Sequence, residues 1–363
     1  MLDLSERRPD AALGDIRYEE RYSRQLRFGP IGRNGQEMLR RASVLIVGIG
    51  ALGASLAQHM ARAGVGTVRI ADRDYVEPSN LQRQSLFDEQ DALQALPKAV
   101  AAAKRLQAIN SGVQIEAHVT DVTERTVEPL AAGVDLVLDG TDNAGTRLLL
   151  NEVCYRNGIP LIYGGVAGSS GMSAVFVPGV TGCLQCVIGG NRDSAADEGM
   201  TCDTVGVISP AVDFTASLQA AEALKWLSGN KKAVRRSLLS YDLWTFGFRE
   251  MQLPGPSSSC PVCGCHADRE YGSVPDVHRQ LAAAALCGRD TVQVTMPHPL
   301  PIREWERVLE ERGCRVMANP YLVRAELPGG HLRLVLFPDG RVLVQGTSDP
   351  DDAMIVCEKY LHF

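Results

Sequence analysis

The chain has 363 residues, of which 45% are hydrophobic and 22% are charged, a length that suggests roughly two or three domains. Its formal net charge of −6 argues against a general nucleic-acid-binding protein, which should be basic. No apolar run is long enough to cross a membrane, and the polar, charged N-terminus argues against a signal peptide, so we expect a cytoplasmic protein.

Patterns typical of strands and helices alternate through the first part of the chain. Residues 1–17 are predicted to form a flexible tail, and a helical lead-in follows at Tyr18–Arg41. The alternation after it predicts an α/β fold with a doubly wound, Rossmann-like and mostly parallel sheet, covered by helices on both faces. The predicted strands are Val44–Val47, Thr67–Ala71, Gln114–Val119, Leu136–Leu138, Pro160–Tyr163 and Met172–Val177, and the main predicted helices are Leu52–Ala63, Lys98–Ala108 and Ala211–Leu227.

The second half of the chain contains two loops and a change of pattern. A glycine-rich turn is expected at Gly164–Gly171, between the last two of these strands. Polar, glycine-containing residues at about 187–209 predict a crossover loop within one domain that spans residues 18–270. Residues 281–363 predict a small, separate α+β domain. Its predicted strands are Thr291–Val294, Tyr321–Glu326, Leu332–Phe337 and Val342–Gln345, and its predicted helices are Trp305–Gly313 and Pro350–Tyr360.

A glycine-rich turn joins the first predicted strand to its helix. Gly48 allows a tight turn, Gly50 lets the backbone approach a phosphate, and Gly53 lets the helix pack close to the strand. The amide groups at the start of that helix favour an anion. Asp72 follows about 20 residues later, where an acid binds ribose hydroxyls in dinucleotide sites. The pattern predicts a nucleotide site, with a tight turn that binds no ligand as the alternative.

The residues after Asp72 help to distinguish between classes of nucleotide. Arg83, in the polar run that begins at Asn80, can neutralise a triphosphate, and Lys98 can supply a second cation at the start of a helix. A hydride-transfer site has no special need for these charges, whereas a site that cleaves ATP does. An NAD-dependent oxidoreductase is therefore the weaker alternative.

Acidic residues follow another predicted strand, in the run Asp139–Asn143. The carboxyl ends of strands are where ligands bind in open α/β sheets. A carboxylate there repels a phosphate but can hold Mg²⁺, which then bridges to the phosphate. The alternative is that Asp142 caps the predicted helix Ala144–Val153, which would explain one acid but not the cluster.

Four cysteines form two Cys-x-x-Cys pairs, Cys183 with Cys186 and Cys260 with Cys263. Each pair can place two thiolates on one tetrahedral ion, and four thiolates complete a closed structural zinc site. A single pair could be a redox motif, whereas two pairs favour zinc. Cys265 lies two residues beyond Cys263 and is an alternative fourth ligand.

Together and in this order, these motifs resemble the ThiF/MoeB/HesA family, the bacterial relatives of ubiquitin-activating enzymes. The resemblance implies that residues 18–270 are an adenylation domain that uses ATP and releases pyrophosphate. Its substrate would be the C-terminal Gly-Gly carboxylate of a ubiquitin-like sulfur-carrier protein. A ThiS-like carrier for thiamine thiazole synthesis is the first choice, and a MoaD-like carrier for molybdopterin synthesis is the alternative. The resemblance rests on Arg21–Gln25, Gly48–Gly53, Asp72–Gln84, Lys98, Asp139–Asn143 and the two Cys-x-x-Cys pairs.

The resemblance also implies roles at the nucleotide site. Asp72 would bind the ribose of ATP, while Asn80, Arg83 and Lys98 would bind its phosphates. Asp142 would be the Mg²⁺ ligand. A nucleotide-binding scaffold without catalytic activity remains an alternative, but the presence of Arg83, Lys98 and Asp142 together argues against it.

Three further roles are implied outside that site. Arg24 would reach into the site of a second subunit, which implies a homodimer. Cys263 rather than Cys265 would be the fourth zinc ligand. Cys202, in the predicted crossover loop, is a candidate catalytic thiol, because relatives that pass on an activated carrier have a cysteine in this region. Other relatives need none, so a covalent role and an inert thiol both remain open for Cys202.

Overall fold

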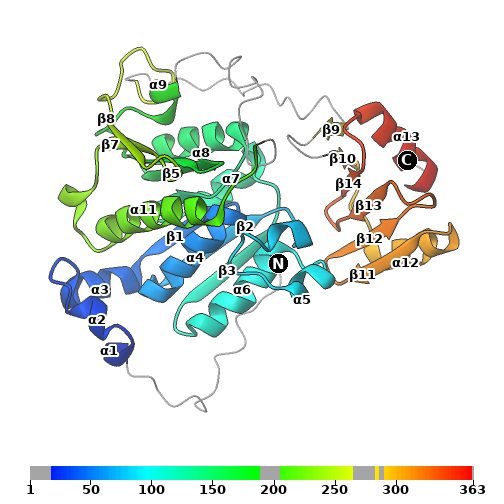
Figure 1. The fold of residues 1–363 in the computed structure, drawn as a ribbon, viewed down its shortest axis with the longest axis horizontal. Helices are drawn as coiled ribbons and strands as arrows, with labels where there is room; N and C mark the ends of the chain where they lie inside the picture. Colours follow the sequence, from blue (N-terminus) through cyan, green and yellow to red (C-terminus); the bar gives the residue numbers. More distant parts are fainter. Residues whose placement is uncertain (1–17, 189–204, 265–282, 286–289, 362–363) are drawn as a thin grey trace. The chain divides into compact units, whose positions relative to one another are not determined.

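The structure, a computed structural model, describes residues 18–188, 205–264, 283–285 and 290–361. The chain divides into two compact units, Met1–Ala267 and Asp268–Phe363. Each unit has its own sheet (Figure 1). Each also has its own hydrophobic core. No helix among the described residues is long and apolar enough to cross a membrane.

The first unit is built on an eight-stranded sheet with the order β3-β2-β1-β4-β5-β6-β7-β8. The strands from β3 to β5 are parallel, and β6, β7 and β8 continue the sheet in antiparallel fashion. The predicted Rossmann-like, mostly parallel sheet is thereby confirmed. Strand order reverses between β1 and β4, which is where ligands bind in sheets of this kind. The strands are β1 (Ser43–Val47), β2 (Thr67–Asp72), β3 (Gln114–Val119), β4 (Leu136–Asp139), β5 (Leu161–Ala167), β6 (Ser170–Phe176), β7 (Ser237–Asp242) and β8 (Gly247–Gln252).

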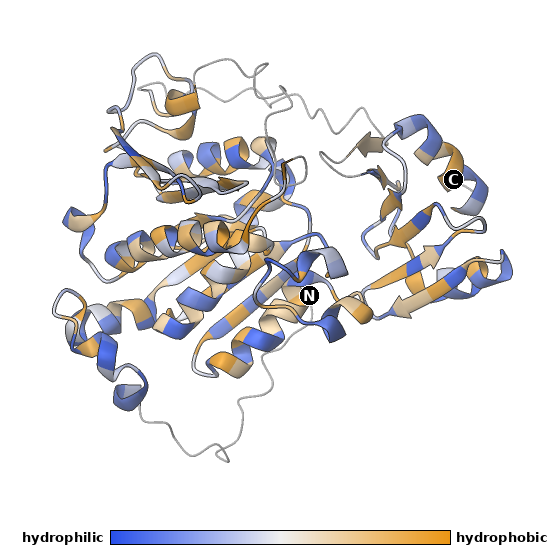
Figure 2. Cartoon of the chain, viewed as in Figure 1, coloured by the Kyte–Doolittle hydropathy of each residue, from blue (hydrophilic) through white to orange (hydrophobic). Residues whose placement is uncertain are grey.

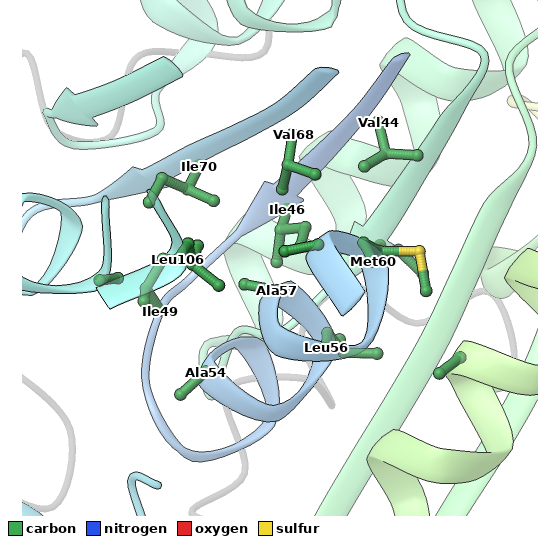
Figure 3. Packing of buried hydrophobic residues seen from close by; sticks show 14 of the residues in the cluster. Val44, Ile46, Ile49, Ala54, Leu56, Ala57, Met60, Val68, Ile70 and Leu106 are labelled. Atoms are coloured by element: carbon green, nitrogen blue, oxygen red, sulfur yellow. The ribbon is translucent and has the colours of Figure 1, made fainter. Parts of the chain in front are cut away.

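Helices cover both faces of this sheet (Figure 1). Alternate residues of β1 point to opposite faces: Val44 and Ile46 join the core under α4, α6 and α11, whereas Leu45 and Val47 join the core under α7 and α8. Figure 3 shows Val44 and Ile46 on the face that packs against α4. The helices are α1 (Tyr18–Arg21), α2 (Ser23–Leu26), α3 (Gly32–Arg41), α4 (Ala51–Ala63), α5 (Glu89–Leu93), α6 (Lys98–Ile109), α7 (Glu124–Ala131), α8 (Ala144–Arg156), α9 (Leu184–Ile188) and α11 (Ser209–Leu227).

The glycine-rich turn predicted at Gly164–Gly171 is wrong. Most of these residues belong to β5 and β6, and only Gly168 and Ser169 form the turn between the two strands. The glycines inside the strands have a packing reason. A Cβ at Gly164 would lie 2.3 Å from the Gln219 side chain, and one at Gly171 would lie 2.5 Å from the Tyr241 hydroxyl.

The second unit contains a six-stranded antiparallel sheet with the order β11-β12-β13-β14-β10-β9. Its core packs α12 and α13 against the sheet, which confirms a small α+β domain. Figure 2 shows hydrophobic residues concentrated on the strands and hydrophilic residues along much of α12. The four predicted strands are present, while β9 and β11 were not predicted. The elements are β9 (Ala283–Ala285), β10 (Thr291–Thr295), α12 (Ile302–Glu311), β11 (Arg315–Asn319), β12 (Leu322–Glu326), β13 (Arg333–Leu336), β14 (Arg341–Gln345) and α13 (Pro350–Leu361).

Candidate functional site

The turn between β1 and α4 depends on three glycines that have different surroundings. Gly48 has a φ of +80°, and a Cβ there would lie 2.8 Å from the carbonyl oxygen of Gly140. A Cβ at Gly53 would lie 1.7 Å from the carbonyl oxygen of Gly48. At Gly50 the nearest atom would be 3.8 Å away, on the side chain of Gln84. Gly48 and Gly53 therefore close the turn, while Gly50 leaves open space at the N-terminus of α4, where an anion is favoured.

Asp72, at the end of β2, holds this turn in place. Its Oδ2 accepts a hydrogen bond from the amide of Ile49 at 2.6 Å, and its Oδ1 accepts one from the amide of Asp74 at 2.7 Å. Burial raises the pKa of Asp72, and the nearby ammonium group of Lys98 opposes this effect. Asp72 therefore joins the glycine turn, through the amide of Ile49, to the segment that follows β2.

Lys98 lies at the start of α6, and its side chain is almost fully buried. Its Nζ is 3.1 Å from Oδ2 of Asp74, and its amide donates to the carbonyl oxygen of Asp74 at 2.9 Å. A cation at the start of a helix is unfavourable for the helix dipole, so a local packing role alone gives little reason for it. The pair with Asp74 and the proximity of Asp72 stabilise this buried charge beside the glycine turn.

The segment after β2 supplies the remaining predicted phosphate ligands. Asn80 is buried, and its Oδ1 accepts from the amide of Glu77 at 3.1 Å. Arg83 is half-buried, and its Nη1 donates to the carbonyl oxygen of Ser79 at 2.9 Å. Gln84 is buried as well, and its Oε1 has no hydrogen-bond partner among the described residues. Sequence reasoning assigned no role to Gln84, although it lies beside the open space at Gly50.

Asp142 is exposed three residues after the end of β4, at the edge where strand order reverses. The suggestion that it caps the next helix is wrong, because Asn143 is the cap of α8. The Oδ1 of Asn143 accepts from the amide of Thr146 at 2.9 Å. Helix capping therefore does not explain the presence of Asp142.

Asp139 is only 1% exposed and has structural partners for both of its oxygens. Oδ1 accepts from the amide (2.9 Å) and the hydroxyl (2.7 Å) of Thr141, and Oδ2 lies 3.2 Å from Nε of Arg147. Sequence reasoning missed Arg147. A usable signal was its position in the first turn of a helix, where the helix dipole favours an anion rather than a cation.

The turn after β4 packs directly against the glycine turn. A Cβ at Gly140 would lie 2.6 Å from the carbonyl oxygen of Gly48 and 2.8 Å from Cα of Gly53. The two turns therefore meet where strand order reverses between β1 and β4. Asp72 bonds to the glycine turn, and Asp142 follows Gly140 and Thr141 in the turn after β4. Lys98 pairs with Asp74 just beyond β2, and Asn80 lies further along that same segment.

Arg24 is not part of this group. It is exposed on α2, and the residues beside it contact the C-terminal ends of two helices. Gln25 donates to the carbonyl oxygen of Ala63, the last residue of α4, and Arg21 donates to that of Ile109, the last residue of α6. Because α4 begins at the carboxyl end of β1, its last turn lies at the opposite edge of the sheet. Arg24 therefore lies at the opposite edge of the sheet from the candidate nucleotide site of its own chain.

The four predicted zinc ligands come together in space. All four sulfur atoms lie within 4.8 Å of one another, with separations of 3.6 Å for Cys183–Cys260 and 3.4 Å for Cys186–Cys263. Tetrahedral Zn–S bonds of about 2.3 Å require sulfur atoms about 3.8 Å apart, so this cluster fits a zinc ion. Burial raises the pKa of Cys186 to about 11, so metal binding at neutral pH would release protons from this cluster.

The later turns of α8 support the cysteine cluster. The amide of Leu184 donates to Oδ1 of Asn151 at 2.9 Å, and the hydroxyl of Tyr155 donates to the carbonyl oxygen of Gly182 at 3.0 Å. Cys202, Cys265 and most of the predicted crossover loop lie outside the described residues.

Comparison with known proteins places this arrangement in a family. A model of the ThiF family matches residues 22–262. The sulfur carrier protein ThiS adenylyltransferase of Bacillus subtilis (strain 168) is 41% identical over 344 residues, which cover 94% of this chain and 99% of the relative. The protein of the same name in Escherichia coli (strain K12) is 38% identical over 245 residues, which cover 67% of this chain and 94% of the relative. The molybdopterin-synthase adenylyltransferase of Escherichia coli (strain K12) is also 38% identical, over 67% of this chain and 96% of its own length.

A solved structure has the same fold at lower sequence identity. The crystal structure of E. coli MccB with ATP has a TM-score of 0.56 and 23% identity, and the match covers 64% of this chain and 68% of that chain. The match to Bacillus subtilis is longer than the first unit and therefore extends into the second. By the family match and by these relatives, the chain belongs to the ThiF family.

Proposed function

We propose that this chain is an adenylyltransferase that activates the C-terminal Gly-Gly carboxylate of a ubiquitin-like sulfur-carrier protein with ATP. The observation that carries the proposal is a set of three features near the point where strand order reverses between β1 and β4. They are an open glycine turn, a buried cation at Lys98 and an exposed carboxylate at Asp142. The relatives in Bacillus subtilis and Escherichia coli support the same reaction, since both are sulfur carrier protein ThiS adenylyltransferases.

The proposed reaction needs positioning and charge neutralisation more than proton transfer. A carboxylate oxygen of the carrier attacks the α-phosphorus of ATP, and pyrophosphate leaves with the electron pair of the broken P–O bond. The carboxylate is ionised at neutral pH, so no general base is required. Lys98, Arg83 and the amides at the start of α4 would oppose the repulsion between the two anions.

Two metal ions fit the residues present. The exposed carboxylate of Asp142 suits Mg²⁺, which prefers one or two carboxylates together with phosphate oxygens. Mg²⁺ in that position would draw charge from the phosphates. The four cysteines suit a closed Zn²⁺ site with a structural role.

The carrier that we favour is ThiS-like, as in thiamine thiazole synthesis. The match to the Bacillus subtilis relative supports this choice, because it extends over both units of the chain. A MoaD-like carrier for molybdopterin synthesis is the alternative, since a molybdopterin-synthase adenylyltransferase is also a relative. We assign the reaction to residues 18–270, and no separate activity to residues 281–363.

ATP–pyrophosphate exchange tests the proposed function. Purified protein is mixed with ATP, labelled pyrophosphate and either a ThiS-like or a MoaD-like carrier, and a carrier without its last glycine is the matched control. Exchange with an intact carrier alone would support adenylation and identify the preferred carrier. Exchange without any carrier, or none with either, would contradict the proposal.

The glycine turn gives a matched pair of variants. Gly50→Ala meets open space, so the fold should survive, but the added methyl group should keep phosphate from the backbone amides. Loss of one charge-assisted hydrogen bond is worth about 1.5–3 kcal/mol, which is about a 10-fold to 150-fold loss of ATP affinity. Gly53→Ala meets backbone at 1.7 Å and should instead lower the free energy of unfolding, by about 1–3 kcal/mol. Calorimetric ATP titration and urea unfolding distinguish the two effects. If both variants lost the same ATP affinity and the same stability, the roles assigned to Gly50 and Gly53 would be contradicted.

We further propose a homodimer in which Arg24 completes the site of the partner subunit. The position of Arg24 at the opposite edge of its own sheet supports this arrangement. Arg24→Ala and Asp142→Ala should each be inactive alone. A mixed dimer of the two variants has one site in which both residues are intact, so mixing should restore activity.

The complementation experiment is checked by measuring exchange after the two variants have been denatured together and refolded. Dimer formation is followed with differently tagged subunits, and Arg27→Ala, a variant of another exposed arginine near α2, serves as a control. Mixed dimers that form but stay inactive would show that Arg24 does not act across the interface.

A further inference from the structure

Arg147 lies in the first turn of α8, and its guanidinium group turns back toward the end of β4. Its Nε is 3.2 Å from Oδ2 of Asp139, and its Nη2 donates to the carbonyl oxygens of Thr141 (2.6 Å) and Gly164 (3.1 Å). The guanidinium carbon lies 5.3 Å from the centre of the Tyr163 ring. One side chain therefore connects the start of α8, the turn after β4 and the middle of β5.

The strands have already separated where Arg147 connects them. The pairing of β4 with β5 ends at Leu138 and Ile162. Beyond that point, Gln219 of α11 donates through its Nε2 to the carbonyl oxygens of Asp139 (2.8 Å) and Ile162 (3.2 Å). Arg147 makes the next connection along the same gap. Side chains from two helices thus hold the turn after β4, where the strand pairing no longer does.

Hydrogen bonds other than those of Arg147 also fix the turn from Asp139 to Thr141. Asp139 accepts both hydrogen bonds from Thr141, and the amide of Gly140 donates to the carbonyl oxygen of Val47 at 2.9 Å. Asp142 follows Thr141 directly in the chain and has an exposed side chain. The backbone position of Asp142 therefore depends on the residues that Arg147 holds.

Arg147 also determines the charge of this turn. Asp139 is 1% exposed, and its carboxylate pairs with the guanidinium group of Arg147. This pair carries no net charge, so Asp142 provides the negative charge of the turn. Without Arg147, Asp139 would be a buried carboxylate without its cation, and the turn would have to rearrange.

We infer that Arg147 is the positioning residue for a divalent cation at Asp142: it fixes the turn from Asp139 to Thr141, where strand order reverses between β1 and β4, and neutralises Asp139. The inference rests on the proposed function, in which Asp142 binds the cation. Partners that orient a metal ligand typically change metal affinity about 10-fold to 100-fold when they are lost.

Calorimetric titration of ATP into the full-length protein, in excess Mg²⁺ or in EDTA, tests this inference without any carrier. Arg147→Met keeps the approximate length of the side chain but removes its charge and donors. Arg147→Lys keeps a positive charge and three donors but loses the planar guanidinium group that reaches several acceptors at once. Arg156→Met is the matched control, because Arg156 lies on the same helix and pairs with Glu128 at 2.8 Å on the exposed surface. Thermal unfolding verifies that each variant is folded.

In the wild type and in Arg156→Met, Mg²⁺ should tighten ATP binding. Arg147→Met should lose about 10-fold or more of this gain, while ATP binding in EDTA changes little. The gain of Arg147→Lys should lie between those of the wild type and Arg147→Met. If Arg147→Met does not fold, the gain of Arg147→Lys decides the result. The inference would be overturned if Mg²⁺ tightened ATP binding in Arg147→Lys, and in Arg147→Met if it folds, as much as in the wild type. It would also be overturned if Mg²⁺ did not tighten ATP binding in the wild type. If neither carrier supports exchange but the Mg²⁺ gain depends on Arg147, the proposed function fails and this inference stands.

Discussion

Asp142→Ala should lower carrier-dependent pyrophosphate exchange by about 100-fold to 1,000-fold, the usual cost of removing a group that stabilises transition-state charge. The fold should not change, because Asp142 is exposed and Asn143 caps the helix that follows. An exposed substitution of this kind shifts the free energy of unfolding by about 0.5 kcal/mol at most. Exchange assays over a range of Mg²⁺ concentrations, combined with urea unfolding, measure both properties.

Asp139→Asn is the matched control for this prediction. Asp139 is buried and pairs with Arg147, so its replacement leaves a buried guanidinium group without its counterion. We expect a loss of about 3 kcal/mol in the free energy of unfolding. Asp142→Ala should therefore lose activity while its stability is kept, whereas Asp139→Asn should lose stability and, through the loosened turn, some activity as well. Asp142→Ala with nearly wild-type exchange, or with a stability loss like that of Asp139→Asn, would contradict the assignment of the cation to Asp142.

Loss of the cysteine cluster should have the largest effect on stability. Cys183 and Cys260 are separated by 77 positions in the chain, so a shared metal closes a long loop. The chain-entropy relation for a cross-link of that span gives about 4.5 kcal/mol. Cys260→Ser should therefore lose the metal and unfold at much lower denaturant concentration. Metal analysis of the wild type should find about one zinc ion per chain.

Cys265→Ser is the control for the metal prediction, because Cys265 neighbours the cluster in sequence. It should keep its zinc and its stability, whereas Cys263→Ser should lose both. The reverse result would make Cys265 the fourth ligand. A stable wild-type protein without zinc would contradict the metal site altogether.

The strands that sequence reasoning found and missed differ in burial. β1 and β4 are short runs of buried apolar residues, which are easily recognised. β8 is exposed at every position, and β7 begins and ends with polar residues, so neither gave a clear pattern. The glycines of β5 and β6 suggested a turn because their partners, Gln219 and Tyr241, are distant in sequence.

Some residues of the candidate site could be predicted from local sequence motifs, and others could not. The glycine turn, Asp72 and Lys98 lie near the ends of the elements that present them, so local motifs located them. Arg147 and Gln219 became evident only when α8 and α11 were packed against the sheet. Gln219, for instance, contacts Asp139 from 80 positions away.

Transfer of a heavy oxygen isotope would test the central claim most directly. The C-terminal carboxylate of the carrier is labelled with heavy oxygen, and the complete reaction with ATP is trapped with hydroxylamine. Because the carboxylate oxygen attacks the α-phosphorus and stays with it when hydroxylamine takes the acyl group, the released AMP should carry one heavy oxygen. Unlabelled AMP, or label in inorganic phosphate instead, would contradict carboxylate adenylation.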